Sequence, residues 1–556
     1  MTTEDIAEVL DITSKLMDLH EENPFKVRAM AGAAYNLSKT RLDLNGKSKE
    51  EIEQLEGVGK GIAAKIFELQ QTGTTQELEE LRSKTPIGVI DMLGIKGLGP
   101  KKVRQLWKGL EVESVGELLY ACNENRLVDL KGFGEKTQES VKQNIEFKLS
   151  NTGKAHYASI EKEALAMVAW LQNGSMFGNV SLTGEVRRKC EIITEIEVLA
   201  ATRMLSKVKT ILTQKAGFKE HETIENAFVS GGDSFKKVIY LCEPENFYKD
   251  LFITTGPDNF VREFLGKDLD DPKSEEDIFE TLKLQYIEPE LRDLEIITQI
   301  AKKNKIPALL EFTDLKGSLH NHSTYSDGMN TLEEMSLECK RLGYEYFGIC
   351  DHSQTAVYAG GLKPETVLLQ QKEIDKLNEK LAPFKIFKGI ESDILGDGRL
   401  DYDESILKTF DFVVASVHSG LKMDQEKATK RLLAAIENPY TTMLGHPTGR
   451  LLLGRPGYPI DHKKIIDACA ANNVIIELNA HPYRLDIDWH WIPYCIEKGV
   501  KISINPDAHQ KEGFADMRFG TLAARKGMLS KEWCFNAMTL KEVETFFNKR
   551  NSNIKS

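Results

Sequence analysis

The sequence lacks the features that mark secreted, membrane-bound and disordered proteins. Its 8 cysteines are scattered over 556 residues without a Cys-x-x-Cys pair, which indicates reduced thiols rather than a disulfide framework. No basic segment followed by an apolar run opens the sequence, and no apolar run approaches the length of a membrane span. The composition carries no bias toward disorder or collagen. We therefore expect a cytoplasmic protein without a membrane partner.

The size and charge of the chain set two further expectations. A chain of 556 residues is too long for one hydrophobic core, so three or more domains are expected. The net charge of −12 argues against a simple nucleic-acid coat, although local basic surfaces remain compatible with it. We expect a monomer.

Three segments near the start share one pattern, in which an apolar residue is followed by x-Gly-apolar-Gly-x and then by a helix. They span residues 55–63, 95–103 and 130–137. The glycines permit a tight turn that exposes backbone N–H groups at the start of the next helix, where a phosphate oxygen fits and nearby lysines add charge. The candidate DNA-binding residues are Gly57, Gly59, Lys60, Gly97, Gly99, Lys101, Lys102, Gly132, Gly134 and Lys136. The pattern resembles the helix-hairpin-helix motif, which grips the DNA backbone without reading sequence. A glycine-stabilised helix connection is the alternative, and the threefold repetition favours DNA binding.

Together with these repeats, residues 23–29 resemble the N-terminal lyase-like and fingers domains of family X DNA polymerases. Lys65 aligns with the lysine that some members use to form a Schiff base with a 5′-deoxyribose phosphate. A solvated or phosphate-contacting lysine is the simpler interpretation, and we do not expect lyase chemistry.

Residues 181–199 resemble the palm of the same polymerases, although the catalytic positions differ. The matching positions are Gly184, Arg187, Arg188, Glu191 and Ile196. Glu185 stands where the family has a triphosphate-binding serine, and Glu195 and Glu197 stand where it has two metal-binding aspartates. The family's third aspartate falls on Val238.

These replacements predict that templated synthesis is weak or lost. Mg²⁺ demands near-octahedral geometry, and each longer glutamate arm moves the ligand oxygens by about 1 Å, which can cost roughly 100-fold in rate. Glu185 adds a negative charge where a triphosphate would dock, and Val238 cannot bind a metal. We therefore do not expect Mg²⁺ in the palm. The alternative is that Glu195 and Glu197 still support weak polymerase activity.

Beyond residue 314, apolar runs of strand length alternate with helical segments. The runs include residues 346–350, 386–390, 412–417, 442–445, 474–478 and 500–504. Such repetition predicts parallel strands, and seven units suit a closed barrel. Metal-competent side chains stand directly after these runs, at the strand ends where active sites of such barrels collect. They are His320, His322, His352, Glu391, His418, His446, Asp507 and His509, and Asp327 follows the first pair in a loop.

The same residues resemble the PHP (polymerase and histidinol phosphatase) domain, and the whole chain resembles bacterial family X polymerases (PolX) fused to such a domain. The match extends to residues 350–353, 446–450, 477–480 and 505–509. The implied fold is a multidomain α/β chain with helical helix-hairpin-helix domains, a nucleotidyltransferase-like palm and a distorted (β/α)7 barrel. The implied domains are a lyase-like domain (1–88), fingers (89–150), palm (151–256), thumb (257–300), linker (301–314) and PHP domain (315–556).

The PHP resemblance implies three metal sites. The first is held by His320, His322, Glu391 and Asp507, the second by Glu391, His418 and His446, and the third by Asp327, His352 and His509. Imidazole and carboxylate ligands suit Mn²⁺, Zn²⁺ or Fe²⁺. Such cations would activate water for phosphoester hydrolysis near neutral pH. Arg450 and Arg455, on the loop after His446, are candidates for phosphate binding, with loop anchoring as the alternative.

The implied activity is 3′-5′ exonucleolytic trimming of DNA in repair, on gapped, nicked or 3′-recessed duplexes and without sequence preference. Three alternatives stay open at this stage. They are a gap-filling polymerase with a proofreading nuclease, a small-molecule phosphatase of the histidinol phosphatase type, and a non-enzymatic DNA-binding scaffold.

Overall fold

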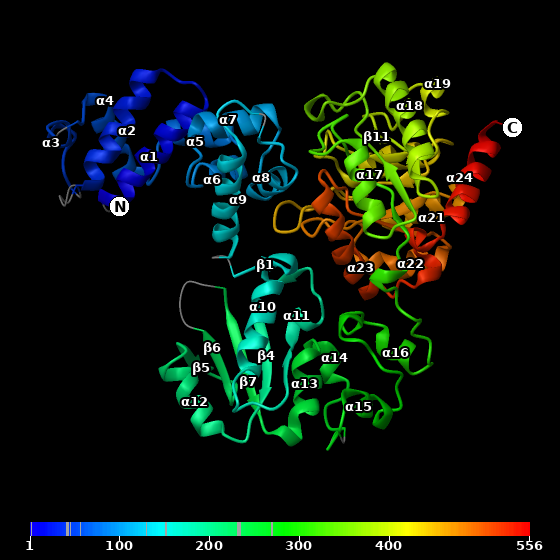
Figure 1. The fold of residues 1–556 in the computed structure, drawn as a ribbon. Coiled ribbons are helices and arrows are strands. Elements are labelled where there is room, and N and C mark those ends of the chain that lie inside the picture. Colours follow the sequence, from blue (N-terminus) through cyan, green and yellow to red (C-terminus); the bar gives the residue numbers. More distant parts are fainter. Residues whose placement is uncertain are drawn as a thin grey trace. The chain divides into compact units, whose positions relative to one another are not determined.

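The computed structural model of the chain describes residues 1–556 except 2, 40–43, 45, 56, 129, 151–152, 231–234, 268, 270 and 556. It forms two compact units, residues 1–147 and residues 148–556 (Figure 1). Within the described residues, no helix has the length and apolar character needed to cross a bilayer.

The first unit is helical. Its helices are α1 (Thr3–Leu19), α2 (Pro24–Lys39), α3 (Lys49–Glu53), α4 (Lys60–Thr72), α5 (Gln76–Ser83), α6 (Ile87–Met92), α7 (Pro100–Gly109), α8 (Val115–Asn123) and α9 (Glu135–Ser150), the last of which runs into the second unit.

The predicted glycine turns are present in this unit. Gly57, Gly97 and Gly132 have φ of +78°, +91° and +87°, a region in which a side chain would be strained. The second glycine of each repeat directly precedes α4, α7 or α9, and Gly59 and Gly99 are the N-caps. Each turn therefore ends at the start of a helix, as the pattern predicted.

The second unit opens with a five-stranded mixed sheet in the order β2-β4-β7-β6-β5. Its strands are β2 (Val180–Leu182), β4 (Ile196–Ala201), β5 (Phe218–Glu220), β6 (Ala227–Ser230) and β7 (Lys237–Cys242), with β1 (Ala155–His156) and β3 (Ile192–Ile193) paired separately. Only β4 and β7 are parallel, because the other neighbours pair antiparallel. Four helices contact this sheet, namely α10 (Tyr157–Gln172), α11 (Gly184–Arg187), α12 (Leu205–Gln214) and α13 (Phe247–Thr255).

The remainder of this unit is a barrel of short parallel strands. They are β8 (Gly317–Ser318), β9 (Tyr346–Ile349), β10 (Lys385–Lys388), β11 (Glu391–Asp393), β12 (Val414–Ser416), β13 (Met443–Leu444), β14 (Ile475–Asn479) and β15 (Ile502–Asn505). Two sheets, β10-β9-β8 and β11-β12-β13-β14-β15, are joined by parallel bridges from His352 to Glu391 and from Asn321 to Ala508. Since β10 and β11 are successive pieces of one chain segment, the barrel has seven strand positions, as predicted.

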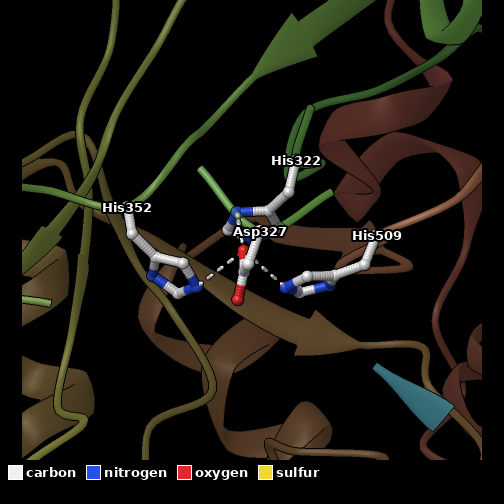
Figure 2. A group of neighbouring side chains, drawn as sticks. All are labelled: His322, Asp327, His352 and His509. Atoms are coloured by element: carbon white, nitrogen blue, oxygen red, sulfur yellow. Dashed lines mark ion pairs between the residues drawn. The ribbon is translucent and has the colours of Figure 1, made fainter. Parts of the chain in front are cut away.

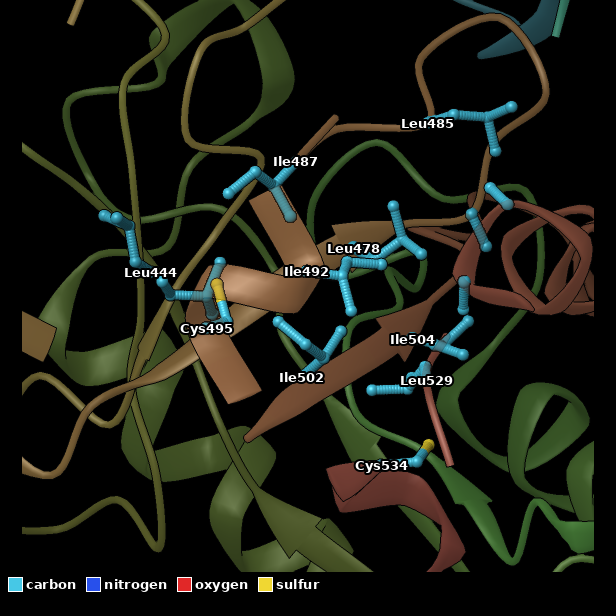
Figure 3. Packing of buried hydrophobic residues seen from close by; sticks show 14 of the residues in the cluster. Leu444, Leu478, Leu485, Ile487, Ile492, Cys495, Ile502, Ile504, Leu529 and Cys534 are labelled. Carbon is cyan, nitrogen blue, oxygen red and sulfur yellow. The ribbon is translucent and has the colours of Figure 1, made fainter. Parts of the chain in front are cut away.

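Helices cover the outside of the barrel. They are α17 (Leu332–Arg341), α18 (Pro364–Leu381), α19 (Glu404–Leu407), α20 (Gln425–Ile436), α21 (His462–Asn472), α22 (Ile492–Lys498) and α23 (Met517–Lys526). The last helix, α24 (Leu540–Lys555), packs instead at the end where the strands begin. Side chains alternate along each strand, so one set faces the helices and the other faces the interior. Figure 3 shows Leu478 and Ile502 beside Ile492 and Cys495 of α22, in the helix-facing core.

The interior of the barrel changes character along its length. On β14, Ile475 belongs to an apolar cluster with Leu319 and Phe412, and Phe547 of α24 joins the same cluster. Two residues further along β14, Glu477 instead forms a buried hydrogen bond with His320. Apolar side chains therefore fill the barrel interior at the end where the strands begin, and polar side chains fill it at the end where the strands finish.

The segment predicted as thumb and linker packs against the barrel's helical layer. It contains α14 (Asp258–Arg262), α15 (Glu275–Thr281) and α16 (Ile297–Ala301), and its apolar residues share one core with the barrel. The finer domain boundaries at 256, 300 and 314 therefore stay predictions.

Candidate metal centre

The candidate ligands meet because they follow parallel strands of one closed barrel. His320 and His322 come after β8, His352 after β9, and Glu391 begins β11. The remaining ligands of this kind come after later strands, namely His418 after β12, His446 after β13, and Asp507 and His509 after β15. Their strands end at one rim, so the barrel brings side chains up to 189 positions apart in sequence into one cluster.

One group of donors surrounds Asp327 (Figure 2). Oδ1 of Asp327 lies 3.3 Å from Nε2 of His509 and 3.6 Å from Nε2 of His352. It lies 4.0 Å from Nδ1 of His322. The loop after His322 therefore folds Asp327 back between three imidazoles, as its position in the sequence suggested.

A second group surrounds Glu391, which is 1% exposed. Its Oε1 lies 3.0 Å from Nε2 of His446 and 3.1 Å from Nε2 of His418. The same oxygen lies 3.3 Å from Nε2 of His320. Oε2 lies 2.9 Å from Nδ1 of His352. One carboxylate therefore touches both groups, which is the position of a bridging ligand.

Asp507 completes the cavity from the last strand. Its Oδ1 lies 2.9 Å from Nε2 of His322 and 3.6 Å from Nε2 of His320. Asp507 has a backbone φ of +54°, a left-handed conformation that aspartate tolerates better than most residues. Its other oxygen accepts a hydrogen bond from Asn479 Nδ2 at 3.0 Å, which orients the carboxylate.

The donor set fits divalent cations. Among the described residues, several buried nitrogen and oxygen atoms of the candidate ligands make no hydrogen bond, although buried polar groups normally do. These atoms are Nε2 of His320, Nδ1 of His322, Nδ1 of His352, Nδ1 of His446 and Oε2 of Glu391. A buried cluster of imidazole nitrogens and carboxylate oxygens, several of them without a hydrogen-bond partner, is the chemistry of a metal site.

The charges in the cavity agree with this interpretation. Burial, together with the neighbouring His509 and His352, lowers the pKa of His322 to about 3, so its imidazole stays neutral and keeps the one lone pair that can bind a metal. Burial alone would lower the pKa of His320, but the charges of Glu477, Glu391 and Asp507 raise it well above its usual value.

Two carboxylates behind the ligands were missed by sequence reasoning. Glu477 accepts a hydrogen bond from His320 Nδ1 at 2.7 Å, and Asp393 accepts one from His418 Nδ1 at 2.5 Å. Each bond fixes the ring so that Nε2 faces the cavity, which is how metal-binding histidines are commonly oriented. Strand periodicity carries a signal for Asp393, because it lies two residues after Glu391 and shares its face of the strand.

Arg484 was also missed. It lies on the loop after β14, its side chain is 7% exposed, and its Nη1 is 4.0 Å from Oδ2 of Asp507. A buried guanidinium therefore borders the candidate metal ligands. No sequence signal separates this arginine from others on loops, because its position depends on the course of the loop in space.

The two arginines predicted to bind phosphate have other contacts. Arg450 donates to Glu191 Oε1 at 2.8 Å, forms an ion pair with Asp488, and donates to the carbonyl of Arg484 at 3.0 Å. Arg455 Nε donates to the carbonyl of Gly449 at 3.1 Å. These contacts favour the loop-anchoring alternative for both.

Among the described residues of the palm, the acids do not form a cluster that could hold a metal ion. Glu197 accepts a hydrogen bond from the Tyr240 hydroxyl at 2.9 Å, and Glu195 forms an ion pair with Lys236. Val238 stands opposite Glu197 in the parallel pairing of β4 and β7, and it is 1% exposed. Burial and the charge of Glu195 raise the pKa of Glu197 to about 7.

The side chains at the positions where the family binds a triphosphate also make hydrogen bonds within the protein. Glu185 Oε2 accepts hydrogen bonds from the backbone N–H of Thr194 at 2.6 Å and from its hydroxyl at 2.9 Å. Arg187 is bidentate to Glu275, at 3.0 and 2.6 Å. These side chains are engaged in the fold rather than directed toward a nucleotide.

In the helical unit, the basic residues of the turns lie at the surface. Lys60, Lys101 and Lys136 are exposed, whereas Lys102 is half-buried and its ammonium lies over the Phe133 ring at 5.3 Å. Lys65 forms an ion pair of 2.6 Å with Glu77. This pairing agrees with a structural lysine at position 65.

Family models match three parts of the chain. A helix-hairpin-helix domain matches residues 1–75, a SAM-like helix-hairpin-helix tandem matches residues 89–145, and the PHP domain matches residues 318–481.

The similar proteins fall into two groups. The DNA polymerase/3′-5′ exonuclease PolX of Bacillus subtilis is 33% identical over 585 aligned residues, which cover 99% of this chain and all of the relative. Probable phosphatases match a shorter part of the chain. That of Caldanaerobacter subterraneus is 31% identical over 34% of this chain and 74% of its own length. That of Acetivibrio thermocellus is 30% identical over 34% of this chain and 78% of its own length.

Proposed function

Because the chain belongs to the PolX family of DNA polymerase/3′-5′ exonucleases, we propose that it is a DNA-binding, metal-dependent 3′-5′ exonuclease that processes 3′ ends in DNA repair. The phosphodiester is hydrolysed in the PHP domain. The unpaired state of all 8 cysteines suits a cytoplasmic enzyme.

The convergence of nine imidazole and carboxylate side chains in one buried cavity carries this proposal. His320, His322, Glu391 and Asp507 would hold one ion, Glu391, His418 and His446 a second, and Asp327, His352 and His509 a third. When bound, Mn²⁺, Zn²⁺ or Fe²⁺ supplies an activated water near neutral pH and stabilises charge on the phosphate.

The protein's own residues prepare the substrate side of this site. Arg484 borders Asp507 from the loop after β14, and its guanidinium matches a phosphate group in geometry and charge. We assign Arg484 to the scissile phosphate.

The helix-hairpin-helix turns would hold the polymeric substrate. They present backbone N–H groups and exposed lysines to phosphates, which favours contact with the DNA backbone over base reading. Gapped, nicked or 3′-recessed duplexes and a monomeric enzyme are part of this proposal.

In the palm, the contacts of Glu185, Glu195 and Glu197 support weak or absent polymerase activity. A small-molecule phosphatase of the histidinol phosphatase type is less well supported, because the phosphatase relatives match about a third of the chain.

A nuclease assay on 5′-labelled DNA tests the proposal. With Mn²⁺ or Zn²⁺ we expect a ladder that shortens from the 3′ end and that disappears with chelator or in a His320→Ala, His322→Ala variant. His462→Ala is the matched control, since this barrel histidine stacks on Trp491 outside the cavity and its loss should leave the ladder intact. Hydrolysis of phosphomonoesters without any ladder would favour the phosphatase instead.

A further inference from the structure

Residues 354–361, here called the rim loop, leave the barrel directly after His352 and return to it. The loop is closed at its base, because the Leu362 N–H donates to the His352 carbonyl at 2.8 Å and the Ser353 N–H donates to the Glu391 carbonyl at 3.0 Å. Both acceptors belong to candidate metal ligands. The rim loop is therefore built on the metal centre.

The tip of the rim loop exposes two apolar side chains beside this centre. Val357 is 81% exposed and Tyr358 is 43% exposed. The centroid of the Tyr358 ring lies 6.2 Å from that of His352. Their neighbours Ala356 and Ala359 are buried, so the loop directs one pair of side chains inward and the other outward.

Hydrogen bonds of Thr355 hold the rim loop to the barrel. The Thr355 hydroxyl donates to Asp401 at 2.9 Å and lies 2.9 Å from an oxygen of Asp393, and the Thr355 N–H donates to Asp401 at 2.7 Å. At Gly361, a Cβ would meet the Ser353 carbonyl oxygen at 2.0 Å, so the two arms of the loop approach as closely as glycine permits. Single exposed apolar residues are common, but these two are held in position by a dedicated set of contacts.

A second loop brings another apolar side chain to the same rim. Met329 follows Asp327, is 45% exposed, and donates its N–H to the His509 carbonyl at 2.6 Å. This loop meets the rim loop where the Cβ position of Gly360 lies 3.4 Å from the carbonyl oxygen of Ser326. Apolar side chains therefore stand on both loops, the one that follows Asp327 and the one that follows His352.

We propose that Tyr358 and Val357 form a stacking subsite for the nucleobase of the 3′-terminal nucleotide, next to the scissile phosphate. This role rests on the proposed nuclease function. A base is joined to its phosphate through a single sugar, so a phosphate held in the cavity brings a base to the rim. Every base has an apolar face, so an aromatic ring binds it without sequence preference.

The test uses two single-stranded, 5′-labelled oligonucleotides that differ in one feature. One ends in a normal 3′ nucleotide, and the other ends in an abasic tetrahydrofuran nucleotide. The proteins are wild type, a Val357→Ser, Tyr358→Ser double variant, Tyr358→Phe, and Leu369→Ser as a control, since Leu369 on α18 is 58% exposed. The rate of removal of the first nucleotide is measured with Mn²⁺.

On the normal end, we expect the double variant to lose about 10-fold or more in kcat/KM through a raised KM. Leu369→Ser should match wild type, and Tyr358→Phe should keep the discrimination between the normal and the abasic end, because the aromatic ring is retained. On the abasic end, wild type and the double variant should be equal, because no base is present to stack. Equal losses on both ends would show damage to the loop and overturn the stacking role, as would the absence of any loss, which would leave the surface to a protein partner. No hydrolysis by wild type on either end would overturn the proposed function and this inference with it.

Discussion

The imidazole of His320 donates its Nδ1 hydrogen to Oε2 of Glu477 across 2.7 Å, and neither side chain is exposed to solvent. His418 forms an equivalent bond of 2.5 Å to Asp393. In both pairs the other ring nitrogen, Nε2, faces Glu391, at 3.3 and 3.1 Å. Two carboxylates outside the set of candidate ligands thus fix which nitrogen each histidine turns toward Glu391.

Glu477→Gln should weaken metal binding without loss of the fold. An amide is a weaker acceptor than a carboxylate, so the His320 ring becomes less basic and less firmly oriented. Losses of this kind reduce metal affinity by about 10- to 100-fold. Titration of Mn²⁺ or Zn²⁺ against a competing chelator measures the change. Glu497→Gln, at an exposed position, is the control, and unchanged affinity in Glu477→Gln would contradict an orienting role.

The candidate ligands could be predicted from the sequence, whereas the residues that hold them in position could not. His446 and Asp507 follow apolar runs, and parallel strands in a barrel end at one rim, so their meeting follows from order along the chain. Glu477 lies inside an apolar run, where a buried acid gives no sign of its partner. Arg484 depends on the course of an irregular loop. Arg450 has the charge for either a phosphate or an acid, and only the fold shows Glu191 beside it.

Glu197→Gln should change how stability responds to pH. The Glu197 carboxyl ionises near 4.5 in the unfolded chain, but burial and Glu195 raise its pKa to about 7 in the fold. Between these values the folded state holds a proton that the unfolded state has released, so stability is lost as pH rises through this window. Glutamine mimics the protonated form and removes the loss, which is worth up to about 3 kcal/mol above pH 7.

Thermal unfolding followed between pH 4.5 and pH 8 tests this relationship. The variant should be more stable than wild type at pH 8, and the difference should shrink toward pH 4.5. Glu222→Gln, at an exposed position of the same domain, should follow wild type throughout. A difference that does not vary with pH would show that Glu197 acts through packing rather than ionisation.

Arg450→Met should destabilise the second unit, because it leaves Glu191 and Asp488 without their guanidinium. Breaking a buried ion pair from one side costs about 3–5 kcal/mol. Denaturant unfolding measures the loss, and Arg399→Met, whose side chain is 78% exposed, should change little. If Arg450 instead clamps phosphate, its loss would raise KM while stability stayed near that of wild type.

Reversing the charge of Lys60, Lys101 and Lys136 together should lower the affinity for DNA. It should also make that affinity less sensitive to salt concentration. Each lost phosphate contact lowers the slope of log affinity against log salt by about 1. Fluorescence anisotropy of a labelled duplex over a salt series gives both quantities. The same reversal at the exposed barrel residues Lys376, Lys427 and Lys541 controls for net charge. Equal effects of the two triple variants would argue against specific contacts at the hairpin turns.

Arg484→Met should impair hydrolysis while leaving the metal ions in place. A guanidinium that neutralises charge developing on a phosphate in a buried site contributes about 100- to 1,000-fold to the rate. The Arg484 side chain is 7% exposed, and its Nη1 lies 4.0 Å from Oδ2 of Asp507. Arg484 is therefore placed to contact the scissile phosphate rather than phosphates elsewhere along the DNA. Arg484→Lys keeps the charge but not the planar fork, and it should recover only part of the rate. Single-turnover rates with saturating Mn²⁺, read beside the Mn²⁺ affinity of each variant, separate the two possible roles. A loss of metal affinity that accounts for the lost rate would instead make Arg484 a support for Asp507.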